Sequence, residues 1–337
     1  MTEKLCNSDV YNTIGIVGAG AWGTALGVVA AQSGRGVILW ARESDVVDSI
    51  NTNHENARFL PGVALATRIR ATAVLDDVCA SDALLVTIPA QHIRATLETL
   101  PRELTSSRPC VLCAKGIEKR SGKLVTEIFA EVFPGERATI LSGPSFAADV
   151  ARAQPTAVTI AGDRIVVGRL QASLASSSFR PYASEDVLGV ALGGAAKNVY
   201  AIACGIVDGL GLGESARAAL IARSFAELAR LGESLGARAD TLMGLSGLGD
   251  LVLTATSPTS RNFTFGQTLG RGATVAELIA PGRPLAEGVD TAPALVERGR
   301  RAGIEFPVAA AVAAILSGKL EIRASVDRLM SRPLTSE

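Results

Sequence analysis

The sequence predicts a doubly wound α/β domain with a parallel sheet, followed by an all-α domain. Short apolar runs rich in β-branched residues alternate with amphipathic stretches of helical period as far as residue 184. A glycine-rich loop, residues 18–23, connects the first apolar run to the first helical stretch. Beyond residue 184 the sequence is rich in alanine and helical in period, and we expect no further strand there.

The expected strands are short apolar segments bounded by polar residues or glycine. Because these segments are continuously apolar and are separated by helical stretches, they indicate parallel strands with helices on both faces of the sheet. In chain order, we expect strands at 13–17, 36–40, 68–72, 83–88, 110–114, 138–142 and 156–160, and residues 179–183 as the last strand.

The glycine-rich loop has the pattern of a Rossmann-type dinucleotide-binding site. Gly18 permits a tight turn, Gly20 allows backbone amides to approach a pyrophosphate, and Gly23 lets the helix pack on the strand. Ala21 and Trp22 complete the loop, and the N-terminus of the following helix faces the negative charge. The alternative is a glycine-rich turn without a ligand.

The end of the second expected strand bears on the choice between NADP and NAD. An NAD-selective protein places an acidic residue about 20 residues after the loop, on the ribose 2′-hydroxyl. Arg42 lies near that position and would suit the 2′-phosphate of NADP, whereas the adjacent Glu43 would suit NAD. Arg42 therefore favours NADP, and NAD remains open.

The chain divides into a flexible leader at 1–12, a dinucleotide-binding domain at 13–184 and a helical substrate domain at 185–337. The leader is polar and lacks the apolar core of a signal peptide, which favours a cytoplasmic protein. We expect no membrane span, because no apolar stretch of about 18 residues is uninterrupted. Lys plus Arg and Asp plus Glu both number 33, so no nucleic-acid partner is expected.

Cysteine and histidine chemistry is not expected in this chain. Cys110 and Cys113 have the C-x-x-C spacing of metal and redox sites, but they lie in an apolar run with no second pair, which indicates core residues and no metal site. Neither His54 nor His92 lies in a cluster suited to hydride transfer. Proton exchange by a lysine is the better hypothesis.

Two segments of the first domain could contribute to a substrate site at the carboxyl edge of the sheet. Lys115 directly follows the expected strand at 110–114 and precedes Gly116, so its side chain could enter the crevice. The alternative is a surface lysine in a turn. After the strand at 138–142, Gly143 and Ser145 could hold an oxygen-rich ligand with backbone amides and a hydroxyl.

Lys197 is the most unusual residue of the helical domain, because it lies within the apolar stretch GGAAKNVYAIA. Burial of a lysine favours the neutral amine, which a general base near neutral pH requires. Gly193 and Gly194, one turn earlier, would allow a ligand to approach closely. The alternative is a lysine at a helix edge whose ammonium reaches solvent.

Further along the helical domain, three segments could complete the site. Asp250, in Gly247–Leu251, could orient Lys197, and Thr254 follows one turn later. Ser260-Arg261-Asn262 places a guanidinium beside an amide, which suits a terminal phosphate. Glu287 lies in the segment RPLAEGVDTAP, a loop that could approach the cofactor.

Taken together, these segments resemble the bacterial-type glycerol-3-phosphate dehydrogenase [NAD(P)+] family from about residue 13 to residue 320. The resemblance is carried by an ordered set of motifs: GAGAWGTAL at 18–26, NARFLPG at 56–62, KGIE at 115–118, GPSFA at 143–147, KN at 197–198, GLGDL at 247–251, SRNFTFG at 260–266 and EGVDTA at 287–292. Many relatives have Ser where Ala21 stands, so a hydroxyl that could contact the pyrophosphate is absent here.

The resemblance implies reversible reduction of dihydroxyacetone phosphate to sn-glycerol 3-phosphate, which supplies glycerophospholipid synthesis. Lys197 would exchange the proton, and Lys115 would polarise the reacting oxygen. The substrate site would include Lys115, Gly143, Ser145, Lys197, Asn198, Asp250, Thr254, Ser260, Arg261 and Asn262. The cofactor site would include Gly18, Gly20, Ala21, Trp22, Gly23, Arg42, Lys115, Ala147, Arg261, Leu285 and Glu287.

Two other functions are compatible with this architecture. A 3-hydroxyacid or 6-phosphogluconate dehydrogenase would need donors suited to a carboxylate, and Ser260-Arg261-Asn262 argues against it. A non-catalytic NAD(P)-sensing module would not need Lys115 and Lys197 together with Asp250. The expected partner is therefore a small phosphorylated substrate, and a homodimer is compatible with the sequence.

Overall fold

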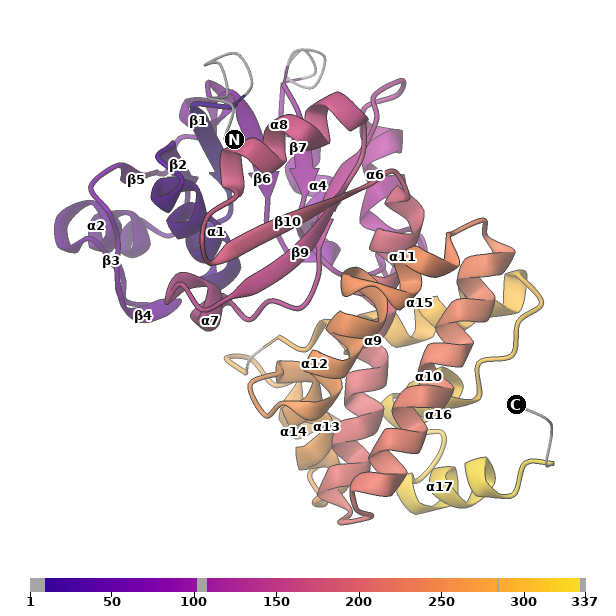
Figure 1. Ribbon diagram of the computed structural model, residues 1–337. Helices are drawn as coiled ribbons and strands as arrows, with labels where there is room; N and C mark the ends of the chain where they lie inside the picture. The colour runs from indigo at the N-terminus through magenta and orange to yellow at the C-terminus, as the bar shows by residue number, and fades with distance from the viewer. Residues whose placement is uncertain (1–9, 102–107, 284, 334–337) are drawn as a thin grey trace. The chain divides into compact units, whose positions relative to one another are not determined.

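The computed structural model describes residues 10–101, 108–283 and 285–333, and it separates into two compact units (Figure 1). The first unit comprises Met1–Lys115 with Val125–Ala191, and the second comprises Gly116–Leu124 with Leu192–Glu337. The division predicted at residues 184 and 185 placed residues 116–124 in the first domain, whereas they belong to the second unit. The conformation of residues 1–9 of the predicted leader lies outside the described residues.

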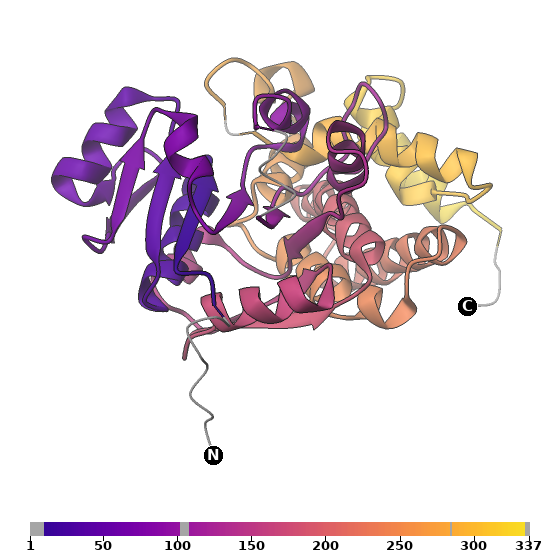
Figure 2. The same cartoon turned by 90° about the horizontal axis from the view of Figure 1, so that it is seen from above.

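The first unit contains an eight-stranded sheet with the order β10-β9-β8-β7-β6-β1-β2-β5, and helices lie on both of its faces (Figure 2). All eight strands were predicted, and the predicted Rossmann-type fold is confirmed. Their bounds are β1 Thr13–Val17, β2 Gly36–Trp40, β5 Ile69–Thr72, β6 Ala83–Val86, β7 Cys110–Leu112, β8 Thr139–Ser142, β9 Thr156–Ala161 and β10 Phe179–Ser184.

The prediction of an entirely parallel sheet was wrong at one place. β8 and β9 pair antiparallel, with Leu141 opposite Ile160, whereas every other neighbouring pair in this sheet is parallel. The connection between β8 and β9 contains only the short helix α7, Ala147–Ala151. A parallel crossover usually returns the chain along the sheet through a full helix, and the five residues of α7 do not provide one, which is consistent with the antiparallel pairing.

A small hairpin was missed in the sequence. β3, Glu55–Asn56, pairs antiparallel with β4, Leu60–Ala64, in a separate two-stranded sheet. Pro61 and Gly62 lie inside β4, and both residue types argue against a strand. Leu60 and Val63 of β4 are buried and the other three residues are exposed, so the strand also lacks the regular alternation that would have revealed it.

The helices of the first unit pack their apolar faces on the sheet. Ile14 and Ile16 of β1, Leu26 of α1 and Leu39 of β2 are fully buried in this core. The helical segments are α1 Ala21–Gln32, α2 Ser44–Asn53, α3 Leu75–Cys79, the 3₁₀ turn η2 Ala90–His92, α4 Ile93–Leu97, α6 Val125–Val132, α7 and α8 Arg164–Leu174.

The second unit is helical, and the described residues beyond 184 contain no strand, as predicted. Its elements are α9 Val187–Gly209, which begins in the first unit, α10 Glu214–Ser234, α11 Ala239–Met243, the π-helical turn η3 Leu245–Gly249, α12 Asp250–Thr256, α13 Arg261–Gly270, α14 Val275–Leu278, α15 Glu287–Arg301, α16 Pro307–Leu316 and α17 Ile322–Met330. Among the described helices, α9 is long and apolar enough to cross a membrane, but it is buried within the protein and is therefore a core helix.

The two helices α9 and α13 approach each other closely because glycines line their contact. A Cβ atom added to Gly205 would lie 2.0 Å from the Phe263 carbonyl oxygen, and one added to Gly266 would lie 2.0 Å from the Ile202 carbonyl oxygen. Such distances are far below van der Waals contact, so only glycine fits at either position. This close packing brings the start of α13 next to the middle of α9.

A buried carboxyl group, Glu227 of α10, joins α10 to the N-terminus of α16. Its Oε1 accepts a hydrogen bond from the Val308 amide at 2.6 Å, and its Oε2 accepts one from the Ala309 amide at 3.3 Å. Burial raises the pKa of Glu227 from 4.5 to about 7 and outweighs these two hydrogen bonds, which lower it.

This raised pKa predicts a pH-dependent contribution to stability. Between about pH 4.5 and pH 7 the folded protein holds a proton on Glu227 that the unfolded chain has lost. The free energy of unfolding therefore falls as the pH rises through this window. Urea unfolding of Glu227→Gln between pH 5 and pH 8 should show a weaker fall than the wild type; parallel profiles would contradict the assignment.

Candidate active site

The glycine-rich loop of the first unit has the geometry that a pyrophosphate site requires. Gly18 has a φ of 113°, in the region that favours glycine, and a Cβ on Gly23 would lie 1.9 Å from the Gly18 carbonyl oxygen. A Cβ on Gly20 would meet no atom within 4 Å, so the loop is open on that side. Gly20 caps α1 without a side-chain hydrogen bond, and the first turn of α1 holds no acidic residue. These features fit an anion at the start of α1.

Side chains behind the loop hold it in this shape. Asn56 is fully buried, and its Nδ2 donates to the Ala19 carbonyl oxygen at 2.8 Å and to the Thr24 hydroxyl at 2.7 Å. Thr87 donates its hydroxyl proton to the Gly18 carbonyl oxygen at 2.7 Å. No role was predicted for Asn56, although it begins the motif NARFLPG. Trp22, beside the loop, has a buried indole Nε1 without a hydrogen-bond partner among the described residues.

Arg42 and Glu43 follow β2 at the carboxyl edge of the sheet, and they form an ion pair. Nη2 of Arg42 lies 3.0 Å from Oε1 of Glu43, and the Arg42 side chain is 83% exposed while that of Glu43 is 25% exposed. The guanidinium is thus accessible to a ligand at this edge. The acidic and basic groups that distinguish NAD from NADP are therefore adjacent, and the specificity prediction remains untested.

The two segments predicted for the substrate site of the first unit converge. Nζ of Lys115 donates to the Gly143 carbonyl oxygen at 2.8 Å, and the Ser145 hydroxyl donates to the same oxygen at 3.0 Å. Gly143 has a φ of 145°, and a Cβ there would lie 2.9 Å from the Val158 Cα. Lys115 is partly buried, and its contact with the Gly143 carbonyl oxygen connects the two segments. Ala147, the last residue predicted here, begins α7.

Lys197 and Asp250 form a buried ion pair in the second unit. Nζ of Lys197 lies 2.5 Å from Oδ1 of Asp250 and donates to the Thr254 hydroxyl at 2.9 Å. The Lys197 side chain is 9% exposed and that of Asp250 is 1% exposed. The alternative of a lysine that reaches solvent at a helix edge is therefore wrong. Burying this pair costs solvation free energy, so its retention favours a functional role over a stabilising one.

A second polar contact joins α9, α13 and α15. Nδ2 of Asn262 donates to Oδ1 of Asn198 at 2.9 Å, and Oδ1 of Asn262 accepts from the Gly288 amide at 2.9 Å. The neighbours of these three residues in the sequence are Lys197, Arg261 and Glu287, each predicted as a site residue. The contact therefore connects the three helix segments that carry these predicted residues.

The remaining predicted residues of the second unit lie at helix starts or in a loop. Ser260 caps α13: its hydroxyl oxygen accepts a hydrogen bond from the Phe263 amide at 3.2 Å. Arg261, the first residue of α13, is exposed, and Glu287, the first residue of α15, is partly buried. Leu285 is 40% exposed, in the loop before α15.

Comparison with known proteins decides the family. Residues 13–166 match the family model described as NAD-dependent glycerol-3-phosphate dehydrogenase N-terminus, and residues 186–327 match the one described as the C-terminus of the same enzyme. The chain belongs to the NAD-dependent glycerol-3-phosphate dehydrogenase family. The family, the fold and the enzyme class predicted from the sequence are therefore confirmed.

Individual relatives are similar to this chain over nearly its whole length. The chain is 53% identical to a glycerol-3-phosphate dehydrogenase [NAD(P)+] of Parvibaculum lavamentivorans, covering 97% of this chain and 98% of that one. It is 54% identical to the enzyme of the same name from a Bradyrhizobium species, covering 98% and 99%. The crystal structure of glycerol-3-phosphate dehydrogenase from Coxiella burnetii superimposes with a TM-score of 0.90 at 35% identity, covering 96% and 100%.

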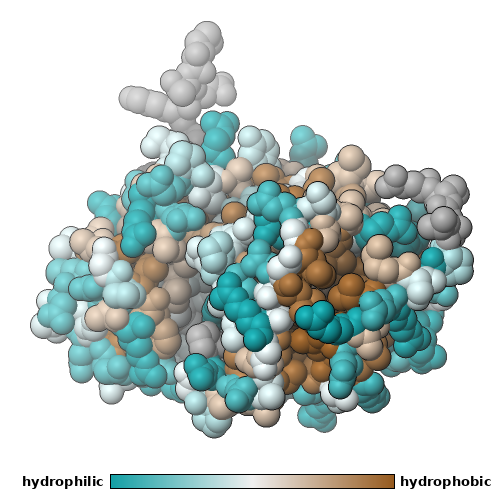
Figure 3. Space-filling view, turned by 90° about the horizontal axis from the view of Figure 1, so that it is seen from below, coloured by the Kyte–Doolittle hydropathy of each residue, from teal (hydrophilic) through white to brown (hydrophobic). Residues whose placement is uncertain are grey.

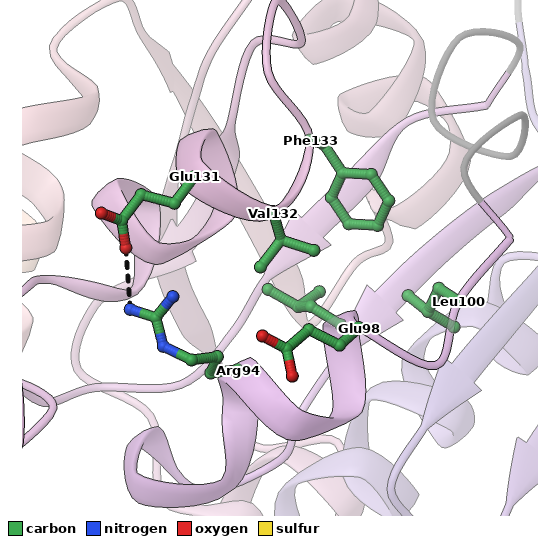
Figure 4. Close-up of a pocket in the computed structure, with 7 residues that line it drawn as sticks. Arg94, Glu98, Leu100, Glu131, Val132 and Phe133 are labelled. Carbon is green, nitrogen blue, oxygen red and sulfur yellow. Dashed lines mark hydrogen bonds and ion pairs between the residues drawn. The ribbon is translucent and has the colours of Figure 1, made fainter.

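A surface pocket of about 320 Å³ between α4 and α6 of this glycerol-3-phosphate dehydrogenase family member is lined by none of the predicted site residues (Figure 4). Two of its lining residues form an ion pair, with Nη2 of Arg94 and Oε2 of Glu131 2.8 Å apart. The other lining residues are Leu97, Glu98, Leu100, Val132 and Phe133. This pocket therefore does not support the predicted site.

The C-x-x-C segment is part of the core, as predicted. Cys110 and Cys113 are buried free thiols. Burial raises the pKa of the Cys110 thiol to about 12 and also raises that of Cys113. Both residues therefore stay protonated near neutral pH, where a thiolate would be needed for metal binding or nucleophilic attack.

Proposed function

We propose that this protein interconverts dihydroxyacetone phosphate and sn-glycerol 3-phosphate with Lys197 as the residue that exchanges the proton. The observation that carries the assignment is the buried group of Lys197, Asp250 and Thr254 in the helical unit. A buried lysine with a carboxylate and a hydroxyl as neighbours is held at one position and is shielded from bulk water. Both conditions favour proton transfer to a substrate oxygen.

The protonation of Lys197 depends on the direction of the reaction. In ketone reduction the Lys197 ammonium donates its proton to the carbonyl oxygen, which becomes the C2 hydroxyl. In alcohol oxidation the neutral amine accepts that proton. When bound, the nicotinamide cofactor supplies or accepts the hydride. The Asp250 carboxylate, 2.5 Å from Nζ, holds the amino group in position for proton transfer in either direction.

Three further residues have proposed roles in substrate binding and chemistry. Lys115 polarises the reacting oxygen, and its contact with the Gly143 carbonyl oxygen supports this because that contact holds the ammonium in one orientation. Arg261, exposed at the start of α13, binds the substrate phosphate. The amide of Asn262 has a second N–H besides the one bonded to Asn198, which can add to that phosphate contact.

The proposed cofactor is NADP in preference to NAD, bound at the glycine-rich loop. Arg42 would pair with the 2′-phosphate, which requires it to leave Glu43. Arg42→Asp should then shift the ratio of kcat/KM values from NADPH towards NADH. One charge-assisted contact corresponds to about 10- to 100-fold. Steady-state rates with both cofactors give this ratio, and the same ratio in wild type and variant would place cofactor selection on another residue.

Glu43→Gln is the matched control for this prediction. It removes the partner of Arg42 and a neighbouring negative charge without removing the guanidinium. If Arg42 binds the 2′-phosphate, this variant should favour NADPH more strongly than the wild type does. Opposite shifts in the two variants would identify the pair as the determinant of cofactor choice.

The proposal extends to a cytoplasmic location, to supply of glycerol 3-phosphate for glycerophospholipid synthesis, and to a homodimer. Exposed apolar side chains in the helical unit support self-association, among them Leu212, Met243, Val252, Ile279 and Met330. Figure 3 shows one face of the molecule, on which apolar residues gather in one area between hydrophilic ones.

The experiment that tests the reaction is a stoichiometric one. The purified protein is mixed with dihydroxyacetone phosphate and a limiting amount of NADPH, and glycerol 3-phosphate is quantified by mass. One glycerol 3-phosphate should form for each NADPH oxidised. Oxidation of NADPH without this product would refute the proposed reaction.

A further inference from the structure

Gly193 of α9 is in unusually close contact with the segment that leads to Asp250. A Cβ atom added to Gly193 would lie 2.6 Å from the Ser246 carbonyl oxygen and 3.0 Å from the Gly247 Cα. The neighbour in both cases is backbone, which cannot rotate away as a side chain could. Any side chain at position 193 would therefore force α9 and this segment apart.

The segment is the π-helical turn η3, Leu245–Gly249, and Asp250 directly follows it. Single π-helical turns are rare in proteins, and those that occur are often found at functional sites. The turn is also packed from its other side, since a Cβ on Gly247 would lie 1.9 Å from the Leu242 carbonyl oxygen of α11. The turn is thus confined between α9 and α11 and has little room to shift.

The helical period relates this contact to the Lys197–Asp250 pair. Gly193 and Lys197 are four residues apart and therefore share one face of α9. Ser246 and Asp250 are also four residues apart, across the junction of η3 and α12. The contact of Gly193 with Ser246 and the contact of Lys197 with Asp250 are therefore one helical turn apart in the same packing interface of α9.

We propose that Gly193 is a positioning residue, which sets the distance between Lys197 and Asp250 through its contact with the π-helical turn. The glycine lets α9 approach the turn until the Asp250 carboxylate reaches Lys197 at 2.5 Å. A larger residue at position 193 moves the carboxylate away and leaves Lys197 without its fixed orientation. This inference rests on the proposed role of Lys197 in proton exchange.

Gly193→Ala is the direct test. We expect kcat to fall by about 10²-fold, the usual effect of displacing a catalytic group by about 1 Å, while the KM for NADPH stays unchanged. The matched control is Gly209→Ala on the same helix, where the added Cβ would lie 2.2 Å from the Gln267 carbonyl oxygen of α13. That variant should lose thermal stability to a similar degree but retain most of its kcat.

A double-mutant cycle with Asp250→Asn separates positioning from general destabilisation. If Gly193 acts through Asp250, the fall in kcat caused by Asp250→Asn should be much smaller in the Gly193→Ala background than in the wild type. If the two substitutions lower kcat independently, so that the fall in the double variant is the product of the two single falls, the proposal is overturned. A normal kcat in folded Gly193→Ala would also overturn it.

If Gly193→Ala does not fold, Ser246→Gly decides the question. It introduces no clash but frees the backbone on which Gly193 packs, and we expect a smaller fall in kcat at an unchanged KM for NADPH. An unchanged kcat would overturn the proposal. Failure of the proposed function has a different signature, because Lys197→Ala would then turn over normally whatever residue stands at position 193.

Discussion

Lys197→Ala is expected to lower kcat by about 10²- to 10⁴-fold, the range for loss of general acid–base catalysis. The affinity for NADPH should change little, because the glycine-rich loop belongs to the first unit and Lys197 to the second. Stopped-flow or steady-state turnover, combined with a fluorescence titration of NADPH, measures both quantities. Near-normal turnover in the folded variant would remove Lys197 from the mechanism.

Loss of stability must be separated from loss of chemistry in this experiment. Lys197→Ala leaves the Asp250 carboxylate buried without its cationic partner, which costs about 3–5 kcal/mol. The double variant Lys197→Met with Asp250→Asn removes both charges and should recover much of that stability but none of the activity. Lys119→Ala is the surface control, because it breaks a Lys–Asp pair at 3.3 Å with Asp290 and should turn over normally.

Arg261→Ala is expected to lower kcat/KM for dihydroxyacetone phosphate by about 30- to 5,000-fold, which corresponds to a loss of roughly 2–5 kcal/mol of transition-state stabilisation. The physical reason is that the substrate phosphate loses a charge-assisted donor and stays partly unpaired. Unphosphorylated dihydroxyacetone should be a poor substrate for the wild type, and the variant should lose little further activity on it. Some rise in the KM for NADPH is compatible with a second contact to the cofactor.

The decisive quantity for Arg261 is the ratio of efficiencies with phosphorylated and unphosphorylated substrate. Arg271→Ala is the control, since Arg271 is exposed at the opposite end of α13. It removes a cation from the same helix and should leave the ratio unchanged. If the ratio also survives Arg261→Ala, phosphate recognition must be assigned to Lys115 and Ser145 instead.

The fold could be predicted because each strand carries its own signal. Segments such as Ile14–Val17 and Ala83–Val86 contain no polar side chain, and each is buried in the sheet. The antiparallel β8–β9 pair could not be predicted in the same way, because strand direction depends on the structure of the connection, here one short helix, and not on the strand residues. The β3–β4 hairpin was hidden by Pro61 and Gly62.

The candidate site was predicted through residues that are out of place in their surroundings. Lys197 is such a residue, a lysine in an apolar helix, and its partner Asp250 lies 53 positions further along the chain. Gly193 was predicted to let a ligand approach, but it packs against the Ser246 backbone instead, and no role was predicted for Asn56, which contacts Ala19. No local pattern reveals either contact. Ser260 was predicted to bind substrate, and the structure shows its hydroxyl capping α13. A glycine in a close helix contact and a glycine in a loop look the same in a sequence.

The most direct test of the central claim is a substrate panel measured with the purified protein. Steady-state oxidation of sn-glycerol 3-phosphate, 6-phosphogluconate and 3-hydroxyisobutyrate is compared, each with NADP+ and with NAD+. The account predicts efficient turnover of glycerol 3-phosphate alone, with a higher kcat/KM for NADP+. Efficient turnover of either carboxylate substrate, or of none of the three, would contradict it.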